Sequence, residues 1–445
     1  MKLPDLTRLL ELGERARRRE VIGRIAAVRG LALEAVGIEA ALGDLCMIHG
    51  GAGLVPAEVV GFGEARLVLM PIGESRGVAQ GDPVSSTGKP IVVRAGEACL
   101  GRILDGLGTA MDGGPPVPGT EVAIAAQAPL PMQRPQIVQR LDTGVSAIDG
   151  FLTCGVGQRI GIFAGSGVGK STLLGQIARD SSADVNVIAL VGERGREVKD
   201  FVEDILGERG MARSVLVVAT SDVPALLRFK ATFTAIAIAE FFRDQGKQVL
   251  FMMDSVTRLA AAAREIGLAI GEPPTLRGYP PSLFSTLPKV VERLGTSGRG
   301  SITGMITVLV EGDDLNEPVS DTMRGLLDGH IVLDRSIAAR GHYPAIDVLD
   351  SVSRLMQRVV PPEQLKTALE LRALLANYEE NRDLIQIGAH QAGADPELDR
   401  AIAAMPDIEA ILYQGTVSRS SEDTWRLMLE LSARLQHQAP GGIIR

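Results

Sequence analysis

A glycine-rich octapeptide in the middle of the chain constrains the fold more than any other stretch. It is the run Ala164-Gly165-Ser166-Gly167-Val168-Gly169-Lys170-Ser171. Glycines at these positions let successive backbone N–H groups turn onto phosphate oxygens, the lysine reaches the β- and γ-phosphates of a nucleotide, and the following hydroxyl is placed to hold Mg²⁺. The pattern predicts a phosphate-binding loop for ATP between a buried strand and a helix.

The sequence on both sides of the loop agrees with this prediction. Residues 158–163 form a short apolar run typical of a buried strand, and residues 171–180 are expected to form a helix opened by the loop. The usual pattern begins with glycine where this chain has Ala164, whose methyl group requires φ < 0 but removes no amide donor. We therefore predict that the nucleotide is bound by Gly165, Ser166, Gly167, Val168, Gly169, Lys170, Ser171 and Thr172.

Length and composition exclude several other classes of protein. A chain of 445 residues is too long for one ordinary core, so two or three domains are expected. Aromatic residues make up 3% and the net charge is −8, which leaves few stacking surfaces and no overall positive field, so nucleic acid is not expected as a partner. Three widely separated cysteines form no metal-ligand spacing and indicate a reducing compartment. With no long apolar run and no signal peptide, we expect a cytoplasmic protein.

Four regions follow one another along the chain. Residues 1–20 predict an amphipathic helix with a basic end, which either docks on a partner or an anionic membrane surface or packs on its own domain. Residues 21–95 predict a small β-barrel, residues 96–360 a phosphate-loop domain with a linker at 110–120, and residues 361–445 a helical domain.

The local patterns behind this division differ from region to region. Short β-prone segments separated by glycine-rich turns lie at 23–28, 57–62 and 67–70. Apolar strand-like runs at 186–191, 214–220, 248–253 and 302–310 alternate with helical stretches such as 225–243, which predicts a mainly parallel sheet. Residues 112–119 are too rich in proline and glycine for a regular element. Helical periodicity marks 363–379, 396–404 and 423–435.

Two carboxylates complete the site predicted from the residues. Asp254 ends an apolar run and is expected to organise Mg²⁺ together with Ser171. Glu193 follows another strand directly and is expected to orient the attacking water, with Arg194 and Arg196 beside it holding the carboxylate ionised. The alternative is that Glu193 is a surface ion-pair residue.

These motifs together resemble the catalytic subunits of rotary ATPases. They resemble more closely the export ATPases of bacterial type III secretion systems and of the flagellum, over roughly residues 20–435. Residues 311–318 and 327–330 are especially typical of the export branch. The segments that carry the resemblance are the phosphate loop and residues 191–194, 254–258, 271–274, 277–282 and 344–354.

The resemblance implies further roles. Arg354 corresponds to the family's arginine finger, which reaches across a subunit interface to the γ-phosphate, and Arg258 to an arginine near that phosphate. Tyr343 corresponds to the aromatic residue that stacks on adenine; the alternative is packing beside Pro344. Glu193 matches the catalytic carboxylate that non-catalytic relatives lack. Lys170, Glu193, Arg194, Asp254, Arg258 and Arg354 are therefore the predicted catalytic residues.

The same resemblance implies the fold, the assembly and the partners. It implies a RecA-like phosphate-loop core with an N-terminal β-barrel and a C-terminal helical domain, assembled as a homohexameric ring. Expected partners are an export-apparatus regulator and stalk proteins, chaperone–substrate complexes, and a membrane export gate at the cytoplasmic face of the inner membrane. Residues 267–285 contain too many glycines and prolines for a long helix, and they correspond to the family's loop lining the central channel or form a rigid structural loop.

Residues 320–325 and 378–385 favour the flagellar enzyme over the virulence injectisome enzyme. An ATP synthase catalytic subunit, a hexameric RNA helicase and an inactive nucleotide-binding subunit could be built on the same core. The export-type segments argue against the synthase subunit. The acidic charge and scarce aromatic residues argue against the helicase, and the presence of Glu193 and Arg354 argues against the inactive subunit.

Overall fold

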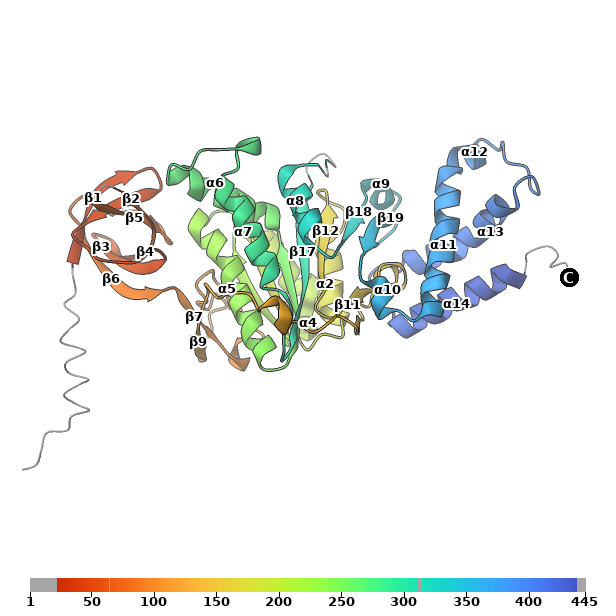
Figure 1. Cartoon of the computed structure of the whole chain (residues 1–445), viewed down its shortest axis with the longest axis horizontal. Helices are drawn as coiled ribbons and strands as arrows, with labels where there is room; N and C mark the ends of the chain where they lie inside the picture. Colours follow the sequence, from red (N-terminus) through yellow and green to blue (C-terminus); the bar gives the residue numbers. More distant parts are fainter. Residues whose placement is uncertain (1–21, 64, 311–313, 315, 438–445) are drawn as a thin grey trace, which may run out of the picture.

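Three units follow one another along the long axis of the molecule (Figure 1). The computed structural model describes residues 22–63, 65–310, 314 and 316–437. A barrel lies at one end, an α/β unit in the middle and a helical unit at the other end. The helix expected over residues 1–20 lies outside the described residues.

The N-terminal unit is a closed six-stranded antiparallel barrel. Its strands follow the order β1 (Ile22–Arg29), β2 (Ala32–Val36), β5 (Arg66–Pro71), β4 (Gly53–Gly63), β3 (Asp44–Gly50) and β6 (Pro83–Pro90) around the barrel. Side chains at alternate positions fill the interior, including Ile25, Ile48 and Leu69, which are almost fully buried. The three β-prone segments expected here fall within β1, β4 and β5.

A nine-stranded sheet forms the centre of the α/β unit. Its main order is β19 (Ile346–Ser353), β18 (Gly329–Leu333), β12 (Arg159–Ala164), β17 (Ser301–Leu309), β15 (Gln248–Asp254), β13 (Val185–Val191), β14 (Ser214–Ala219) and β8 (Ile103–Leu104), with β16 (Gly295–Thr296) beside β17. The pairs from β18 to β8 are parallel, whereas β19 and β16 run antiparallel to their neighbours. The mainly parallel sheet predicted from the sequence is confirmed.

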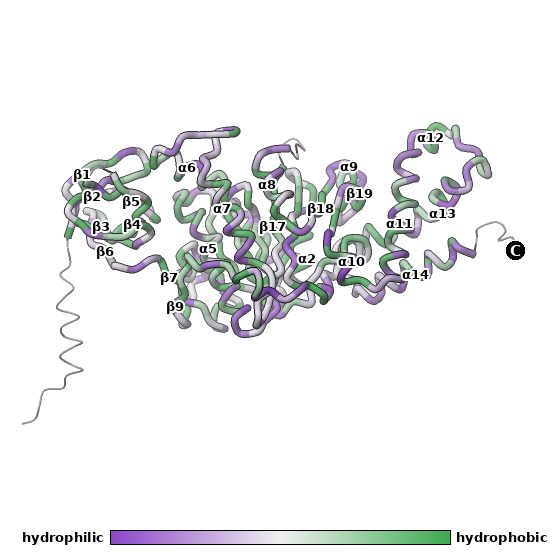
Figure 2. The backbone as a smooth tube through the Cα atoms, in the orientation of Figure 1, coloured by the Kyte–Doolittle hydropathy of each residue, from purple (hydrophilic) through white to green (hydrophobic). Residues whose placement is uncertain are grey.

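Helices cover both faces of this sheet, so its inner strands are apolar on both sides. In β13, Ile188 and Leu190 pack with α2 (Lys170–Asp180), while Val187, Ala189 and Val191 pack with the opposite layer. That opposite layer comprises α5 (Ala225–Asp244), α6 (Val256–Ala269) and α7 (Pro281–Glu292). Figure 2 shows the resulting hydrophobic colouring along the central strands. A continuous apolar run was therefore the correct signal for a buried parallel strand.

The segment between the barrel and the sheet is irregular but anchored. β7 (Val92–Ala95) pairs with β9 (Thr120–Ala123), and residues 111–119 between them contain no helix or strand. Arg102 holds this stretch by an ion pair with Asp112 at 2.6 Å and a hydrogen bond to the Pro115 carbonyl at 3.0 Å. The guanidinium also holds the pKa of Asp112 well below its usual range.

The glycine- and proline-rich stretch expected over residues 267–285 is shorter in the structure. Helix α6 continues to Ala269 and α7 begins at Pro281, because proline is tolerated in the first turn of a helix. Between them only the short turn η5 (Leu276–Gly278) is helical. Leu276 is 69% exposed at the tip. The expectation of a loop therefore holds for residues 270–280 alone.

The C-terminal unit is helical, as predicted. It contains α11 (Pro362–Glu380), α12 (Arg382–Gln386), α13 (Pro396–Leu412) and α14 (Ser421–His437). The expected helix over 396–404 runs on through Pro406 to Leu412. Trp425 and Met428 of α14 share one apolar core with the short turn η3 (Ala147–Phe151) of the α/β unit. This shared core ties the helical unit to the face of the sheet that carries α2.

The buried ion pair between Arg293 and Glu240 supplies a test of the packing. The two side chains are 4% and 8% exposed, their Nη2 and Oε2 atoms lie 2.5 Å apart, and Arg293 also donates to the Ile124 carbonyl at 2.6 Å. We expect Glu240→Ala to lower the free energy of unfolding by about 3–5 kcal/mol, because it leaves a buried guanidinium without its carboxylate.

Chemical and thermal unfolding would measure this loss. The control is Asp200→Ala, which removes a half-exposed partner 3.8 Å from Arg196 and should change stability by less than about 0.5 kcal/mol. Equal effects of the two substitutions would contradict the role given to the buried pair.

Candidate functional site

The phosphate loop joins the end of β12 to the start of α2. Gly167 and Gly169 adopt φ values of 80° and 86°, which residues with a Cβ atom rarely adopt. Gly169 precedes the helix without a side-chain cap, so the first amide groups of α2 keep their donors for a ligand. Ala164 is the last residue of β12 and has a strand conformation, so its methyl group is accommodated as expected. The loop is thus built to bind an anion.

Two further residues predicted to bind the nucleotide, Ser171 and Thr172, lie in the first turn of α2. Ser171 is half-buried and Thr172 is exposed, directly after Lys170. Val168 is buried beneath the loop, whereas Ser166 and Gly167 are exposed at its surface. The turn therefore presents a hydroxyl beside the lysine.

Lys170 contacts the two predicted carboxylates. Its Nζ atom lies 2.5 Å from Oδ1 of Asp254 and 3.9 Å from Oε1 of Glu193, and all three side chains are 15% exposed or less. Asp254 ends β15 and Glu193 follows β13 by two residues; the parallel pairing of these strands aligns Leu190 with Asp254. The structure therefore brings together three residues that the sequence separates by up to 84 positions.

Burial raises the pKa of Glu193 to about 7, and repulsion from Asp254 adds to the effect while Lys170 opposes it. The ammonium group of Lys170 is the cation near both carboxylates, and it lies closer to Asp254 than to Glu193. The expectation that neighbouring arginines hold Glu193 ionised is wrong. Arg194 and Arg196 are 79% and 82% exposed, and they pair with Glu197 and Asp200 instead.

Arg194 affects Glu193 only indirectly in this structure. Its Nη1 atom lies 3.1 Å from Oε1 of Glu197, and Glu197 shares a hydrogen bond with Glu193. That hydrogen bond holds the pKa of Glu197 below its usual range. The pKa values of the two carboxyl groups are therefore shifted in opposite directions, that of Glu193 upward and that of Glu197 downward.

Arg258 and Tyr343 pack against the glycines of the site. A methyl group placed on Gly192 would lie 2.8 Å from Cβ of Arg258, and one on Gly169 would lie 3.2 Å from the ring of Tyr343. Tyr343 is 40% exposed, and its carbonyl accepts a hydrogen bond from the Gly415 amide at 2.8 Å. Tyr343 thus lies beside the phosphate loop with its ring open to a ligand, and Arg258 lies beside Gly192, the residue before Glu193.

Arg354 lies at the opposite edge of the sheet from the loop. It follows β19, and its amide donates to the carbonyl of Asp328, the residue before β18. At the other end of β18, Leu333 pairs with Ala164. Asp328 precedes Leu333 by five residues, which places Arg354 about 17 Å along the strand from the level of the loop. The arginine cannot serve the phosphate loop of its own chain.

Sequence reasoning missed two groups around the site. Thr307 of β17 donates from its hydroxyl to Asp254 at 2.8 Å, and it is fully buried. His342 stacks on Tyr413 with ring centroids 4.1 Å apart, beside Tyr343. The presence of Thr307 within an otherwise apolar strand could have indicated the first of these groups from the sequence. The second joins residues 71 positions apart, which no spacing in the sequence indicates.

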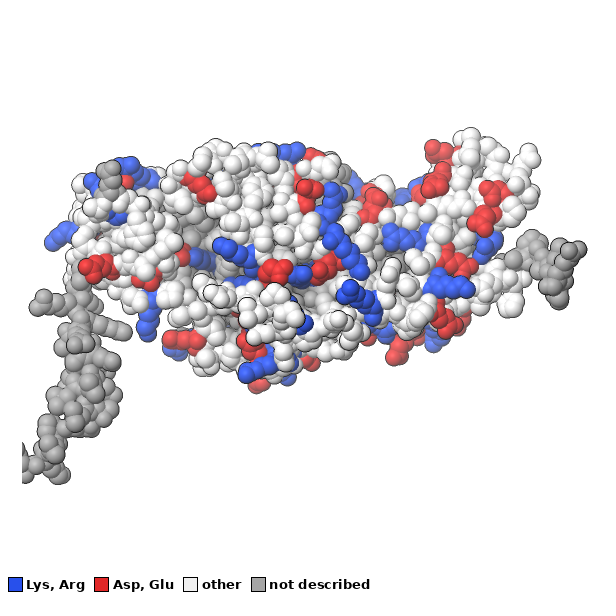
Figure 3. Space-filling view, viewed as in Figure 1, with Lys and Arg blue, Asp and Glu red and all other residues white. Residues whose placement is uncertain are grey.

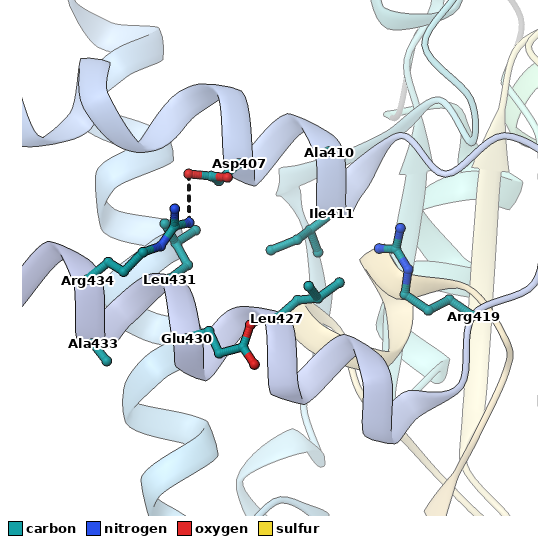
Figure 4. A pocket seen from close by; sticks show the side chains of 9 residues that line it. All are labelled: Asp407, Ala410, Ile411, Arg419, Leu427, Glu430, Leu431, Ala433 and Arg434. Carbon is teal, nitrogen blue, oxygen red and sulfur yellow. Dashed lines mark ion pairs between the residues drawn. The ribbon is translucent and has the colours of Figure 1, made fainter.

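One hollow of the described residues lies away from this site. It is an open groove of about 700 Å³ between α13 and α14, lined by Ile411, Leu427 and Leu431 with the Asp407–Arg434 ion pair at 2.9 Å across it (Figure 4). No predicted site residue lines it.

Two further features are absent from the described residues. Among them there is no group of three or more histidine, cysteine, aspartate or glutamate side chains that would hold a metal ion alone. No helix in the described part of the chain is long and apolar enough to span a bilayer. On the face drawn in Figure 3, basic and acidic side chains are interspersed rather than gathered into one field.

Comparison with known families matches three consecutive parts of the chain. Residues 25–88 match the β-barrel domain of the ATP synthase alpha/beta family, and residues 144–353 match the nucleotide-binding domain of the same family. Residues 360–430 match the C-terminal domain of the T3SS EscN ATPase.

Individual relatives match most of the chain. It is 50% identical to a flagellum-specific ATP synthase of Bacillus subtilis, over 94% of this chain and 95% of the relative. It is 49% identical to a type 3 secretion system ATPase of Xanthomonas euvesicatoria, over 92% and 94%. The structure of the assembled ATPase EscN from the enteropathogenic E. coli type III secretion system superposes with a TM-score of 0.87 at 47% identity, covering 92% of this chain and 99% of that one.

The raised pKa of Glu193 predicts a pH dependence of stability in the protein without nucleotide. The folded state binds a proton on Glu193 that the unfolded chain has released at the same pH, so stability should fall as pH rises from about 5 to about 7. Glu193→Gln removes this contribution. We expect the thermal unfolding midpoint of the substituted protein to fall less over that range, measured in EDTA.

Glu203→Gln provides the control, because Glu203 is 62% exposed and lies outside the site. It should leave the pH profile of the wild type unchanged. A wild-type profile parallel to that of Glu193→Gln would show that Glu193 is already ionised in the folded protein.

Proposed function

The chain belongs to the ATP synthase alpha/beta family, in the branch of flagellum-specific ATP synthases and type III secretion ATPases, and from that premise we propose how it works. It is an ATPase of protein export. We propose that it hydrolyses ATP at sites shared between neighbouring copies of itself in a homohexameric ring.

One observation carries the proposal of a shared site. The phosphate loop, Lys170, Glu193 and Asp254 meet at the carboxyl ends of the parallel strands, while Arg354 lies exposed at the amino ends. Each copy therefore offers one part of a site at each edge of its sheet. A second copy placed against the first would complete the site, and a single copy would lack the arginine finger.

The residues of one copy would bind the nucleotide and activate water. Lys170 and the loop amides would hold the phosphates, and the Tyr343 ring would stack on adenine. Glu193 would orient a water molecule for in-line attack on the γ-phosphorus. A carboxylate with a pKa near neutrality is suited to accept the proton of that water. The products would be ADP and phosphate.

The hydroxyl of Ser171 and the carboxylate of Asp254 fit a Mg²⁺ ion that accompanies the nucleotide. Both are oxygen ligands of the kind this ion prefers, and a magnesium site of this class is completed by phosphates and water. When bound, the ion neutralises charge on the phosphates. In this structure Lys170 and Thr307 hold the same carboxylate in place.

Arginines would supply the remaining charge. Arg354 of the neighbouring copy would reach the γ-phosphate, because a guanidinium is planar and always charged. Arg258 lies beside Gly192, the residue before Glu193, and would approach that phosphate from within the copy. Arg194 would act through Glu197, to which it is paired.

The assembly and partners follow from the relatives. Structures exist of the assembled ATPase EscN and of EscN in complex with its central stalk EscO; the latter matches with a TM-score of 0.86 at 46% identity over 92% of this chain and 99% of that one. We extend ring assembly and a stalk partner to this chain. The loop of residues 270–280, in which Leu276 is 69% exposed, would line the channel.

The proposed biological role is protein export by the flagellar apparatus. Residues 320–325 and 378–385 support the flagellar system over the injectisome. An export regulator, chaperone–substrate complexes and the export gate at the inner membrane would be the further partners.

The first test of this function is Lys170→Ala. Loss of the ammonium group that holds the phosphates should lower ATP turnover by at least about 10³-fold, measured as phosphate release. Lys199→Ala removes an exposed lysine that pairs with Glu203 at 3.8 Å, and it should leave turnover unchanged. Substantial turnover by Lys170→Ala would overturn the phosphate-loop assignment.

The second test mixes two inactive variants. Glu193→Gln and Arg354→Ala should each be inactive alone, yet a one-to-one mixture should regain up to about a quarter of wild-type turnover. In the mixture some interfaces pair an intact Glu193 with an intact Arg354 of the neighbour. No recovery in rings shown by mass to be mixed would contradict a finger that acts across the interface.

A further inference from the structure

We propose that Asp328 is a positioning residue that holds Arg354 toward the site of the neighbouring copy. This inference rests on the proposed function, in which Arg354 acts across an interface. It concerns the amino end of β12, at the opposite end of that strand from the phosphate loop.

Asp328 joins the start of β12 to the residue that follows β19. Its carboxylate accepts hydrogen bonds from the backbone amide, Nε and Nη2 of Arg159 at 3.0, 3.0 and 3.1 Å. Its own amide donates to the Arg159 carbonyl at 2.8 Å, and its carbonyl accepts from the Arg354 amide at 3.0 Å. One residue therefore fixes the backbone of Arg354 to the first residue of β12.

A second set of contacts fixes the preceding residue. The hydroxyl of Ser353 donates to the Thr153 carbonyl at 2.8 Å, and Nε2 of Gln158 lies 3.1 Å from the same hydroxyl. Gln158 is fully buried and also contacts the Asp328 carbonyl at 3.2 Å. Ser353 is therefore held through its side chain to the segment that leads into β12, and Arg354 is held through its amide to Asp328.

The side chain of Arg354 is exposed, unlike its anchored backbone. Its Nη2 atom donates to the Arg324 carbonyl at 3.2 Å, in the last turn of α8 (Pro318–Leu326). A cation is favoured at a helix C-terminus. A fixed backbone with an exposed guanidinium suits a side chain that must reach a phosphate bound to another copy. The starting position of the side chain is then fixed before the copies assemble.

The ion pair between Arg159 and Asp328 is the contact that fixes Asp328, and through it the Arg354 backbone. Arg159 and Asp328 are 18% and 23% exposed, and their contact is bidentate, so solvent screens it less than a surface ion pair. Strand β12 then carries the phosphate loop of one site at its carboxyl end and the support for the finger of the next site at its amino end.

The test is Asp328→Asn, which keeps the size of the side chain and removes the charge that holds Arg159. Misplacing a catalytic group by about 1 Å costs up to about 100-fold, so we expect kcat to fall about 10- to 100-fold with KM for ATP little changed. The control is Glu292→Gln, which removes the other carboxylate partner of Arg159, at 2.8 Å, without touching the Arg354 backbone. It should keep wild-type turnover.

Mixed rings separate positioning of the finger from any other effect. Asp328→Asn mixed with Glu193→Gln should regain activity, because the Glu193→Gln copies supply intact fingers. Asp328→Asn mixed with Arg354→Ala should gain none, because both copies then lack a well-aimed finger. Mass photometry would verify that mixed rings form in each case.

Each other outcome overturns the proposal. Recovery with Arg354→Ala would place the defect in the copy's own nucleotide site, and recovery with neither partner would indicate a structural defect. If the mixture of Glu193→Gln and Arg354→Ala itself fails to recover, the finger assignment is wrong, and the role of Asp328 fails with it.

Discussion

The parallel pairing of β12 with β17 and β18 is the constraint on which both halves of the proposed site depend. Parallel strands put all their carboxyl ends at one edge, so Ala164, Asp254 and the residues after Val191 meet there. The same pairing sends the amino end of β12 to the opposite edge, where Arg159 meets Asp328. A chain organised in this way presents a nucleotide loop on one edge and an arginine on the other, which is the arrangement a closed ring of identical copies requires.

The predictable features were those that short stretches of sequence specify. The glycine loop needs φ values that only glycine adopts easily, and the apolar runs of the inner strands reflect burial on both faces. Asp254 was predicted because it ends such a run, and the helical C-terminal unit because its periodicity is local. Helix ends were less predictable: α13 passes through Pro406, and α7 begins directly at Pro281.

Features set by contacts between distant segments were not predictable from spacing. Arg194 and Arg196 are close to Glu193 in sequence, but Arg194 is the N-cap of α3 (Gly195–Asp200), Arg196 lies in that helix, and both are exposed. They pair with Glu197 and Asp200 and do not hold Glu193 ionised. The charge state of Glu193 depends instead on burial and on Asp254, 61 positions away. The contacts of Thr307 with Asp254 and of Arg159 with Asp328 likewise depend on the order of strands in the sheet, which cannot be read from a single sequence.

The central claim is that the catalytic unit is an interface between copies. It is tested most directly by measuring ATP turnover per chain against protein concentration, with mass photometry on the same samples. The account predicts that turnover per chain is near zero for the monomer and rises cooperatively as six-membered rings form. Turnover per chain that is the same in samples of monomer and of rings would contradict it, because Arg354 would then have no part in the reaction.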